Sequence, residues 1–113
     1  MKRKRVIKNG EEILSVAVAD SYFLRLRGLI GRSAAEIGGL WIKPCNQIHT
    51  CFMSEDIDVI YLSKENAVVQ IDPAVPRSKF CRMVKKARSV LELPAGKANE
   101  LNISINDKLE FQI

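Results

Sequence analysis

The residues best suited to chemistry are one histidine and two cysteines within a short segment, Cys45, His49 and Cys51. His49 and Cys51 would share one face of an extended strand. Imidazole and thiolate bind soft metal ions, and the same pair can act as base and nucleophile. The spacing matches no standard zinc pattern, and a cysteine nucleophile needs an imidazole aimed at it. We therefore predict buried thiols and a hydrogen-bonded histidine, with no metal and no cofactor.

Three further charged residues extend this segment into a candidate cleft. Asp58 would fix the tautomer of His49 if the strand register places both on one face of the sheet, although a structural hydrogen-bonding role is favoured. Glu92 precedes an expected helix, so capping of backbone N–H groups is the leading interpretation and catalysis the alternative. Arg27 would form a salt bridge with an acid or bind an anion. The candidate cleft comprises Arg27, His49, Phe52, Met53, Asp58 and Glu92.

Basic residues are concentrated in two segments of a chain whose net charge is +5. Eleven of the 18 lysines and arginines lie in residues 2–8 and 77–88, and the second segment has no acid. Such segregation indicates a surface for phosphates or an acidic partner, or else a flexible tail over residues 1–5 and a solvated loop. Nucleic-acid binding is a weaker interpretation, because the loop offers only Phe80 for stacking. The candidate surface comprises Arg77, Lys79, Arg82, Lys85, Lys86 and Arg88.

Length and composition predict a single domain over residues 1–113. The chain is 47% hydrophobic, and no stretch approaches the roughly 20 apolar residues of a membrane span. Lys8, Glu11 and Glu12 interrupt any apolar region of an export signal. Three cysteines without such a signal favour reduced thiols and a cytoplasmic protein. We expect a monomer whose partner is a small ligand or another protein.

The first part of the chain predicts a hairpin followed by two helices. Asn9-Gly10 is a typical two-residue turn between strands over residues 6–8 and 13–18. A helix is expected from Asp20, because Tyr22, Phe23, Leu26, Leu29 and Ile30 recur at helical spacing, with Arg25 and Arg32 on the other side and Gly31 as its end. Ser33 and Glu36 match a capping box that would begin a second, short helix.

The remainder predicts short strands over residues 40–42, 48–53, 57–62, 67–71, 88–93 and 108–113. Alternation in residues 88–93 places Leu91 and Leu93 on one face and Val90 and Glu92 on the other. Pro94 is expected to begin a short helix that ends at Leu101. Together these patterns predict an α+β, mostly β domain: a small barrel-like antiparallel or mixed sheet of six to eight short strands, with two or three short helices.

Five segments taken in order resemble family 192 of the domains of unknown function (DUF 192). They are residues 27–32, 39–42, 48–53, 57–62 and 91–96, and the resemblance covers roughly residues 14–112. It implies a small, mostly β domain of bacteria and archaea whose activity is not established, and it supplies no catalytic residues. Some bacterial relatives are encoded near pilus or secretion genes, which implies an accessory role there. The family commonly has an aromatic residue in place of Cys51, so a metal site that used this thiol would not be a family property.

The sequence is compatible with three functions. We favour a small binding or accessory module rather than an enzyme, and this requires at least three of Arg27, His49, Asp58 and Glu92 to line one pocket. The first alternative is a hydrolase-like enzyme that uses His49 with a carboxylate. The second alternative is nucleic-acid binding through the basic segments.

Overall fold

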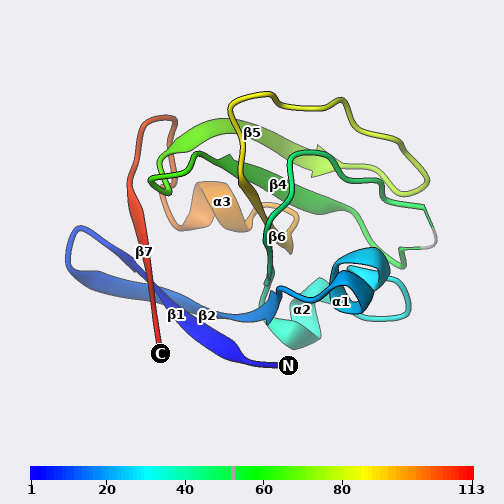
Figure 1. The fold of residues 1–113 in the computed structure, drawn as a ribbon, viewed down its shortest axis with the longest axis horizontal. Coiled ribbons are helices and arrows are strands. Elements are labelled where there is room, and N and C mark those ends of the chain that lie inside the picture. Colours follow the sequence, from blue (N-terminus) through cyan, green and yellow to red (C-terminus); the bar gives the residue numbers. More distant parts are fainter. Residues whose placement is uncertain (52) are drawn as a thin grey trace.

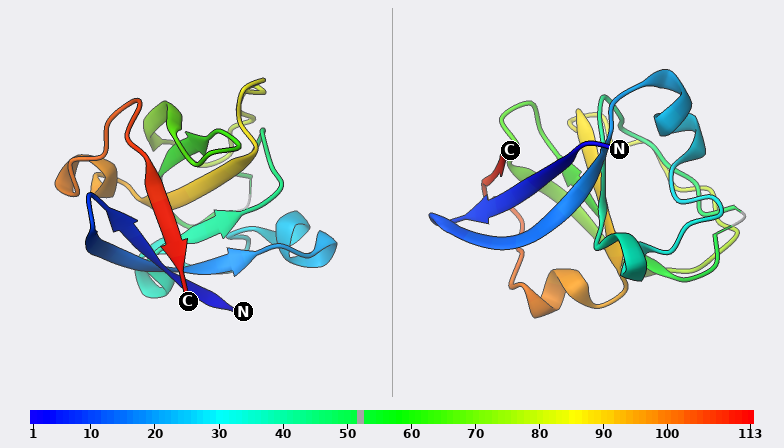
Figure 2. Two further views of the ribbon diagram at one scale, coloured as in Figure 1. Left: turned by 60° about the vertical axis from the view of Figure 1, so that its left-hand side comes forward. Right: turned by 90° about the horizontal axis from the view of Figure 1, so that it is seen from below.

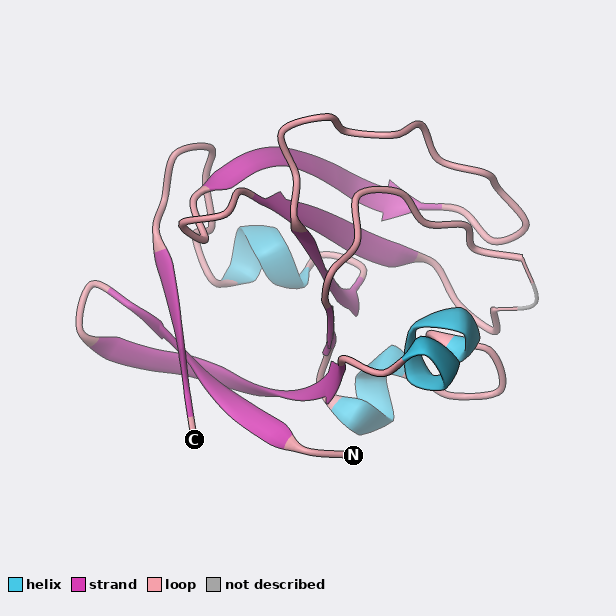
Figure 3. Cartoon of the chain, viewed as in Figure 1, coloured by secondary structure: helices cyan, strands magenta, loops and turns pink. Residues whose placement is uncertain are grey.

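The computed structural model describes residues 1–51 and 53–113, and these form one curled sheet with three short helices (Figures 1 and 3). The seven strands lie in the order β5-β4-β6-β3-β2-β1-β7. They are β1 (Arg3–Lys8), β2 (Glu11–Ala19), β3 (Leu40–Ile42), β4 (Ile57–Leu62), β5 (Val68–Val75), β6 (Ser89–Pro94) and β7 (Leu109–Gln112). The helices are α1 (Tyr22–Arg27), α2 (Ala34–Ile37) and α3 (Lys97–Glu100). The predicted α+β, mostly β class is confirmed, but the sheet is not closed, so it resembles a barrel only loosely.

The chain opens with the predicted hairpin of β1 and β2. Asn9 and Gly10 have φ angles of 53° and 78° and form the turn, as this residue pair favours. Arg3, which the sequence placed in a flexible tail, instead pairs with Ala17 in the ladder. Its guanidinium donates to the Ser15 hydroxyl at 3.2 Å and to the Ile37 carbonyl at 2.9 Å. The basic start of the chain is therefore built into the sheet.

The two edge strands of the sheet meet at one end. Val68 of β5 donates its N–H to the Asp107 carbonyl, and Asn106 donates to the Val68 carbonyl, both at 2.8 Å. An isolated bridge joins Ala67 to Lys108 in the same place. We call this contact between residues 66–68 and 106–109 the edge latch. It curls the sheet around its interior at the end of the molecule on the left of Figure 1, and Figure 2 shows the same curl from two other sides.

The sheet separates two hydrophobic cores. The first core contains Val59, Tyr61 and Val90, and it also includes Ala34 of α2 and Leu29 from the segment before α2. The second core contains Leu91 and Leu93 and packs against Ala98 of α3. Alternating strand residues face opposite cores because successive side chains point to opposite faces of a sheet. The predicted division of β6, with Leu91 and Leu93 apart from Val90, is confirmed.

The first helix is shorter than predicted, and the face that was expected to be buried is exposed to solvent. Ser21 rather than Asp20 caps α1, since its hydroxyl accepts the Leu24 N–H, and Gly28 at φ 53° ends it. The apolar side chains that were expected to face the core are exposed, namely Tyr22 (76%), Phe23 (67%) and Leu26 (63%). Leu29 supplies the buried contact instead, but from beyond the end of the helix. None of the helices in residues 1–51 and 53–113 is long and apolar enough to cross a membrane.

The strand predicted over residues 48–53 is wrong for the part that the structure describes. This segment runs beside the loop that follows β5. The backbone N–H of Cys81 donates to the Ile48 carbonyl at 3.1 Å, and the backbone N–H of Thr50 donates to the Lys79 carbonyl at 2.7 Å. His49 and Phe80 form an isolated bridge. The segment thus pairs with an irregular loop rather than with β4, which β5 and β6 already flank on both sides.

Gly39 lies where two strands approach closely. A Cβ atom at this position would lie 2.7 Å from Leu93 Cδ2 and 3.0 Å from Val16 Cγ1. We expect Gly39→Ala to lower the free energy of unfolding by roughly 1–3 kcal/mol, because the packed side chains must shift. Gly10→Ala is the control, since that turn glycine has open space around it and a positive φ as well. Equal losses in thermal unfolding temperature for both variants would contradict this account.

Candidate functional site

A cavity of about 180 Å³ lies between α1, the segment that follows β3, and β6. Its wall combines apolar side chains, such as Ile42 and Ile48, with several polar groups. The polar groups and the methionine beside them come from residues far apart in the sequence: Arg25, Arg27, Gln47, His49, Met53 and Glu92. The fold therefore brings three of the four polar residues predicted for the cleft to one cavity.

Glu92 is the most unusual residue in this wall. It lies in the middle of β6, opposite Leu40 of β3 and Val59 of β4, and is only 1% exposed. Its side chain shares the face of Val90 and so points toward the first core. The carboxyl atom Oε1 is buried without a hydrogen-bond partner. Burial raises the pKa of Glu92 to about 8, so at neutral pH the carboxyl group is mostly protonated and can both donate and accept a hydrogen bond.

Two other residues of the cavity carry buried polar atoms without partners. His49 Nδ1 is one, and the His49 ring lies 5.7 Å from the ring of Phe80, centroid to centroid. Arg25 Nε is the other, although the same guanidinium donates to the Pro44 carbonyl at 3.4 Å. Buried polar groups are almost always hydrogen-bonded in proteins. Three unpaired atoms around one cavity therefore indicate a place for a polar molecule.

Asp58 does not belong to the cavity, although the sequence placed it in the cleft. It follows the alternation of β4 and shares the face of Ile60 and Leu62, toward the second core. Asp58 Oδ1 accepts the Ala74 N–H at 2.8 Å, and Oδ2 accepts the Ala98 N–H of α3 at 2.9 Å. The sheet thus lies between Asp58 and His49, and the carboxylate has the structural role that was favoured for it.

Asp58 has the helix-binding role that the sequence suggested for Glu92. Glu92 was expected to cap the helix after β6, but the N-cap residue of α3 is Gly96, which has no side chain, and Asp58 accepts the Ala98 N–H. The physical reason is the side of the sheet on which α3 packs. Ala98 belongs to the second core, whereas Glu92 points toward the first.

The remaining predicted cleft residues divide between the cavity and the surface. Met53 is buried at 9% exposure and lines the cavity. Arg27 lines it from the exposed end of α1, where its Nε donates to the Ile30 carbonyl at 3.3 Å. Phe52 lies outside the described residues. Arg25 and Gln47 were not predicted. Arg25 was assigned to the side of α1 away from the core, and nothing in the local sequence around Gln47 distinguishes it.

A second capping role also differs from the prediction. The hydroxyl of Ser33 accepts the Glu36 N–H, as the capping box requires. The carboxylate that serves the start of α2, however, is that of Glu55, which accepts N–H groups from Ala34 and Ala35. These two hydrogen bonds connect the loop before β4 to α2, whose Ala34 is part of the first core.

The cysteines are free thiols. Cys45 donates to the Gln47 carbonyl at 3.3 Å, and burial raises the pKa values of Cys45 and Cys81. Raised pKa values keep both sulfurs protonated, which disfavours metal binding and nucleophilic attack. Within residues 1–51 and 53–113, no three histidine, cysteine, aspartate or glutamate side chains are grouped as metal ligands.

The two basic segments differ in how their charges are used. In the first, Lys2, Arg5 and Lys8 form ion pairs at 3.5, 3.5 and 3.1 Å with Asp20, Glu12 and Asp107. In the second, all six basic side chains of residues 77–88 are exposed. The segments do not adjoin, because β1 runs along the bottom of Figure 1 and the loop along its top.

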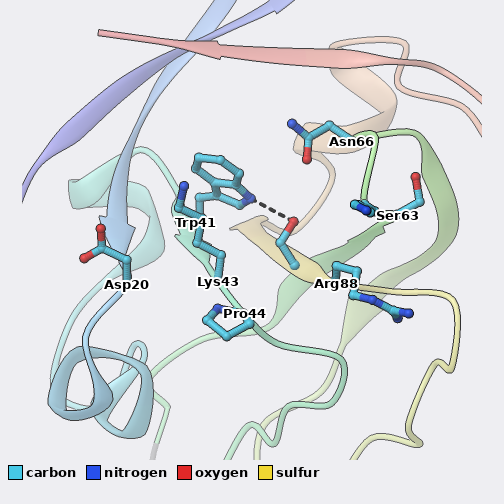
Figure 4. Close-up of a pocket in the computed structure, with 9 residues that line it drawn as sticks. Asp20, Trp41, Lys43, Pro44, Ser63, Asn66 and Arg88 are labelled. Carbon is cyan, nitrogen blue, oxygen red and sulfur yellow. Dashed lines mark hydrogen bonds between the residues drawn. The ribbon is translucent and has the colours of Figure 1, made fainter.

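A larger pocket of about 490 Å³ lies beside Trp41 and is drawn in Figure 4. The Trp41 indole N–H donates to the Ser89 hydroxyl at 3.0 Å. One face of the ring stacks on Phe111 at 3.7 Å, and Lys43 Nζ lies 4.4 Å from its centroid. The indole is therefore fully engaged within the fold, and none of the buried unpaired atoms found in the described chain belongs to this pocket.

The fold and the cavity define a class of small α+β domain, in which an open, curled mixed sheet contributes a buried carboxyl group to a cavity beside its first core. A model of the family DUF192, described as "Uncharacterized ACR, COG1430", matches residues 5–111. The chain belongs to this family, which confirms the resemblance found in the sequence.

Its relatives include proteins of archaea. A UPF0127 protein of Pyrococcus furiosus is 29% identical over 93% of this chain and 94% of its own length. A UPF0127 protein of Thermococcus sibiricus is 31% identical over 87% of this chain, and the match spans 66% of that relative. Two solved structures share the fold. A candidate transcription regulator of Sinorhizobium meliloti has a TM-score of 0.79 and 24% identity, and the match covers 96% of this chain and 92% of that one. A protein of unknown function of Novosphingobium aromaticivorans has a TM-score of 0.78 and 19% identity, and the match covers 96% of this chain and 83% of that one.

Proposed function

We propose that this protein binds a small polar molecule in the cavity formed by Arg25, His49 and Glu92. The observation that carries the proposal is Glu92, which is almost fully buried and presents a carboxyl oxygen without a partner in the wall of a cavity. Leaving such a group unpaired costs about 1–3 kcal/mol, and a ligand that pairs with it recovers this free energy.

The size and charge of the cavity restrict the ligand. A volume of about 180 Å³ is below the common range for drug-sized ligands. The protonated carboxyl of Glu92 suits a hydroxyl or an amide group, and Arg25 Nε–H requires an acceptor such as a carbonyl or carboxylate oxygen. Small hydroxy acids and small amides have both features.

The test is a thermal-shift screen at pH 6.5 with small hydroxy acids, amino acids and primary amides at millimolar concentration. A ligand of the folded state raises the unfolding temperature by mass action. We expect at least one compound to stabilise the wild type and not Glu92→Met, which fills similar space without a polar group. Glu110→Met is the control, because Glu110 is exposed on β7. Stabilisation that survives in Glu92→Met would place the ligand elsewhere, and a screen without any stabilising compound would contradict the proposal.

A hydrolase-like activity is the second candidate, because two titratable side chains with unpaired atoms line one cavity and the pKa of Glu92 is close to neutral. Perturbed groups of this kind are frequent in catalytic sites. We expect hydrolysis of a small ester or phosphate ester, if it occurs at this site, to fall at least a hundredfold in both His49→Ala and Glu92→Gln. Turnover that is equal in the wild type and both variants would exclude the cavity as its source.

Two other interpretations stay predictions. The side chains that line the cavity give no support to an accessory role near pilus or secretion systems. Nucleic-acid binding is supported by the exposed basic loop and by the description of the Sinorhizobium meliloti protein as a candidate regulator. Against it, the cations of the first basic segment are paired with acids of the same chain.

A further inference from the structure

Large apolar side chains are exposed on two segments at the same end of the molecule. On α1 these are Tyr22, Phe23 and Leu26, at 76%, 67% and 63% exposure. On the loop after β5 they are Phe80 and Met83, at 78% and 53%. In Figure 1, α1 lies toward the right-hand end, opposite the edge latch, and the loop after β5 begins at that end before it runs along the top. Exposed apolar groups gathered in this way are typical of an interaction surface.

Residues 47–49, which line the cavity, lie between these two sets of side chains. His49 lines the cavity together with Leu26 of α1, and on its other side it forms the bridge with Phe80. We call the surface made by α1 and residues 77–88 the apolar-basic end. Figure 2 shows α1 standing out from the sheet. Lys79, Phe80 and Arg82 of the loop line a pocket of about 490 Å³.

The charge of the apolar-basic end has one sign. Neither α1 nor residues 77–88 contains an acidic residue. The cations of the loop are exposed, and none of the ion pairs found among the described residues includes them. Arg25 turns inward to the cavity, so the outermost side chains of α1 are apolar and the cations lie beside them.

We propose that the apolar-basic end binds the surface of membranes that contain anionic lipids. Aromatic and aliphatic side chains enter the headgroup region, while flanking lysines and arginines lie against lipid phosphates. Large apolar side chains that stand in solvent beside cations outside any ion pair suit the interface of an anionic lipid layer, which takes up both kinds of group. They suit lipid better than a nucleic-acid strand, which stacks its bases on several aromatic side chains, because the loop itself offers only Phe80.

The test is co-sedimentation with extruded vesicles made of equal parts phosphatidylglycerol and phosphatidylcholine. We expect binding in 50 mM salt, at least tenfold weaker binding in 500 mM salt, and at least tenfold weaker binding to pure phosphatidylcholine. Phe23→Ser with Phe80→Ser, and separately Arg82→Glu with Lys85→Glu, should each weaken binding at least tenfold. All four residues are exposed, so the folded sheet should tolerate these changes.

Matched controls change the same residue classes elsewhere. Ile105→Ser with Ile113→Ser, and Lys64→Glu with Lys108→Glu, alter exposed residues outside the apolar-basic end and should change vesicle binding less than twofold. No binding to anionic vesicles, or equal losses in the controls, would overturn the proposal. So would a single-stranded oligonucleotide that binds with the same sensitivity to the variants while the vesicles do not. Glu92→Met should bind vesicles like the wild type, which separates this inference from the proposed cavity ligand.

Discussion

Raising the pH from 5 to 8.5 is expected to destabilise the protein by roughly 4 kcal/mol through the carboxyl group of Glu92. Burial raises its pKa from the ordinary 4.5 to about 8 in the folded state. Between these values the folded state binds more protons than the unfolded state, so the free energy of unfolding falls as the pH rises. The stabilisation is complete below pH 4.5 and is lost by about pH 8, at about 1.4 kcal/mol for each unit of pKa difference.

Urea denaturation at several pH values measures this effect, and Glu92→Gln identifies its source. An amide does not titrate, so the variant should lose most of the pH dependence between pH 5 and 8.5. Glu65→Gln, which changes an exposed residue, should keep it. The ionisable side chains around Glu92 are Arg25, Arg27, Cys45, His49, Tyr61 and Cys81. If Glu92→Gln has the same pH dependence as the wild type, one of these groups is responsible and the raised pKa of Glu92 is refuted.

Asp58→Ala is expected to lower the free energy of unfolding by about 3–5 kcal/mol. The Asp58 side chain is buried and accepts one N–H from a bulge in β5 and one from α3. Removing it leaves the amides of Ala74 and Ala98 without their acceptor, and hydrogen bonds to a charged group contribute about 1.5–3 kcal/mol each. Ala74 also has a positive φ of 47°, a strained conformation that the bond to Asp58 holds in place.

Denaturation in urea again provides the measurement, with Asp56→Ala as the matched control. Asp56 is exposed and lies two residues away, so its removal should cost less than about 0.5 kcal/mol. Asp58→Asn should fall between the wild type and Asp58→Ala, because the amide retains one acceptor oxygen. If Asp58→Ala is as stable as Asp56→Ala, the two backbone contacts do not stabilise the fold as described.

Local patterns were enough to predict the hairpin and most of the strands. Asn9 and Gly10 suit the positive φ angles of the turn by their own chemistry, and alternation in β6 is a property of any extended strand. The orientation of α1 was not predictable in this way. Its apolar spacing indicates a buried face, but the structure leaves Tyr22, Phe23 and Leu26 in solvent, and contacts far along the chain decide this.

The candidate site was predictable only in part, because local patterns do not show to which face of the sheet a side chain points. Residue type and spacing identified His49, Arg27 and Glu92, which the structure places in one cavity. They could not separate Glu92 from Asp58, since both are carboxylates in apolar strands. What distinguishes them is the face of the sheet to which each points and the side on which α3 packs, and neither is encoded within a few residues.

The edge latch has a consequence for aggregation. Edge strands expose unpaired N–H and C=O groups that can pair with strands of other molecules. Residues 66–68 use part of the β5 edge against residues 106–109, so the far half of β5 is the stretch left open. That half contains Pro73 and the irregular backbone at Ala74, opposite Asp58, and a proline and a bulge both hinder the docking of a neighbouring strand. The β5 edge of the sheet is thus hindered from pairing with strands of other molecules.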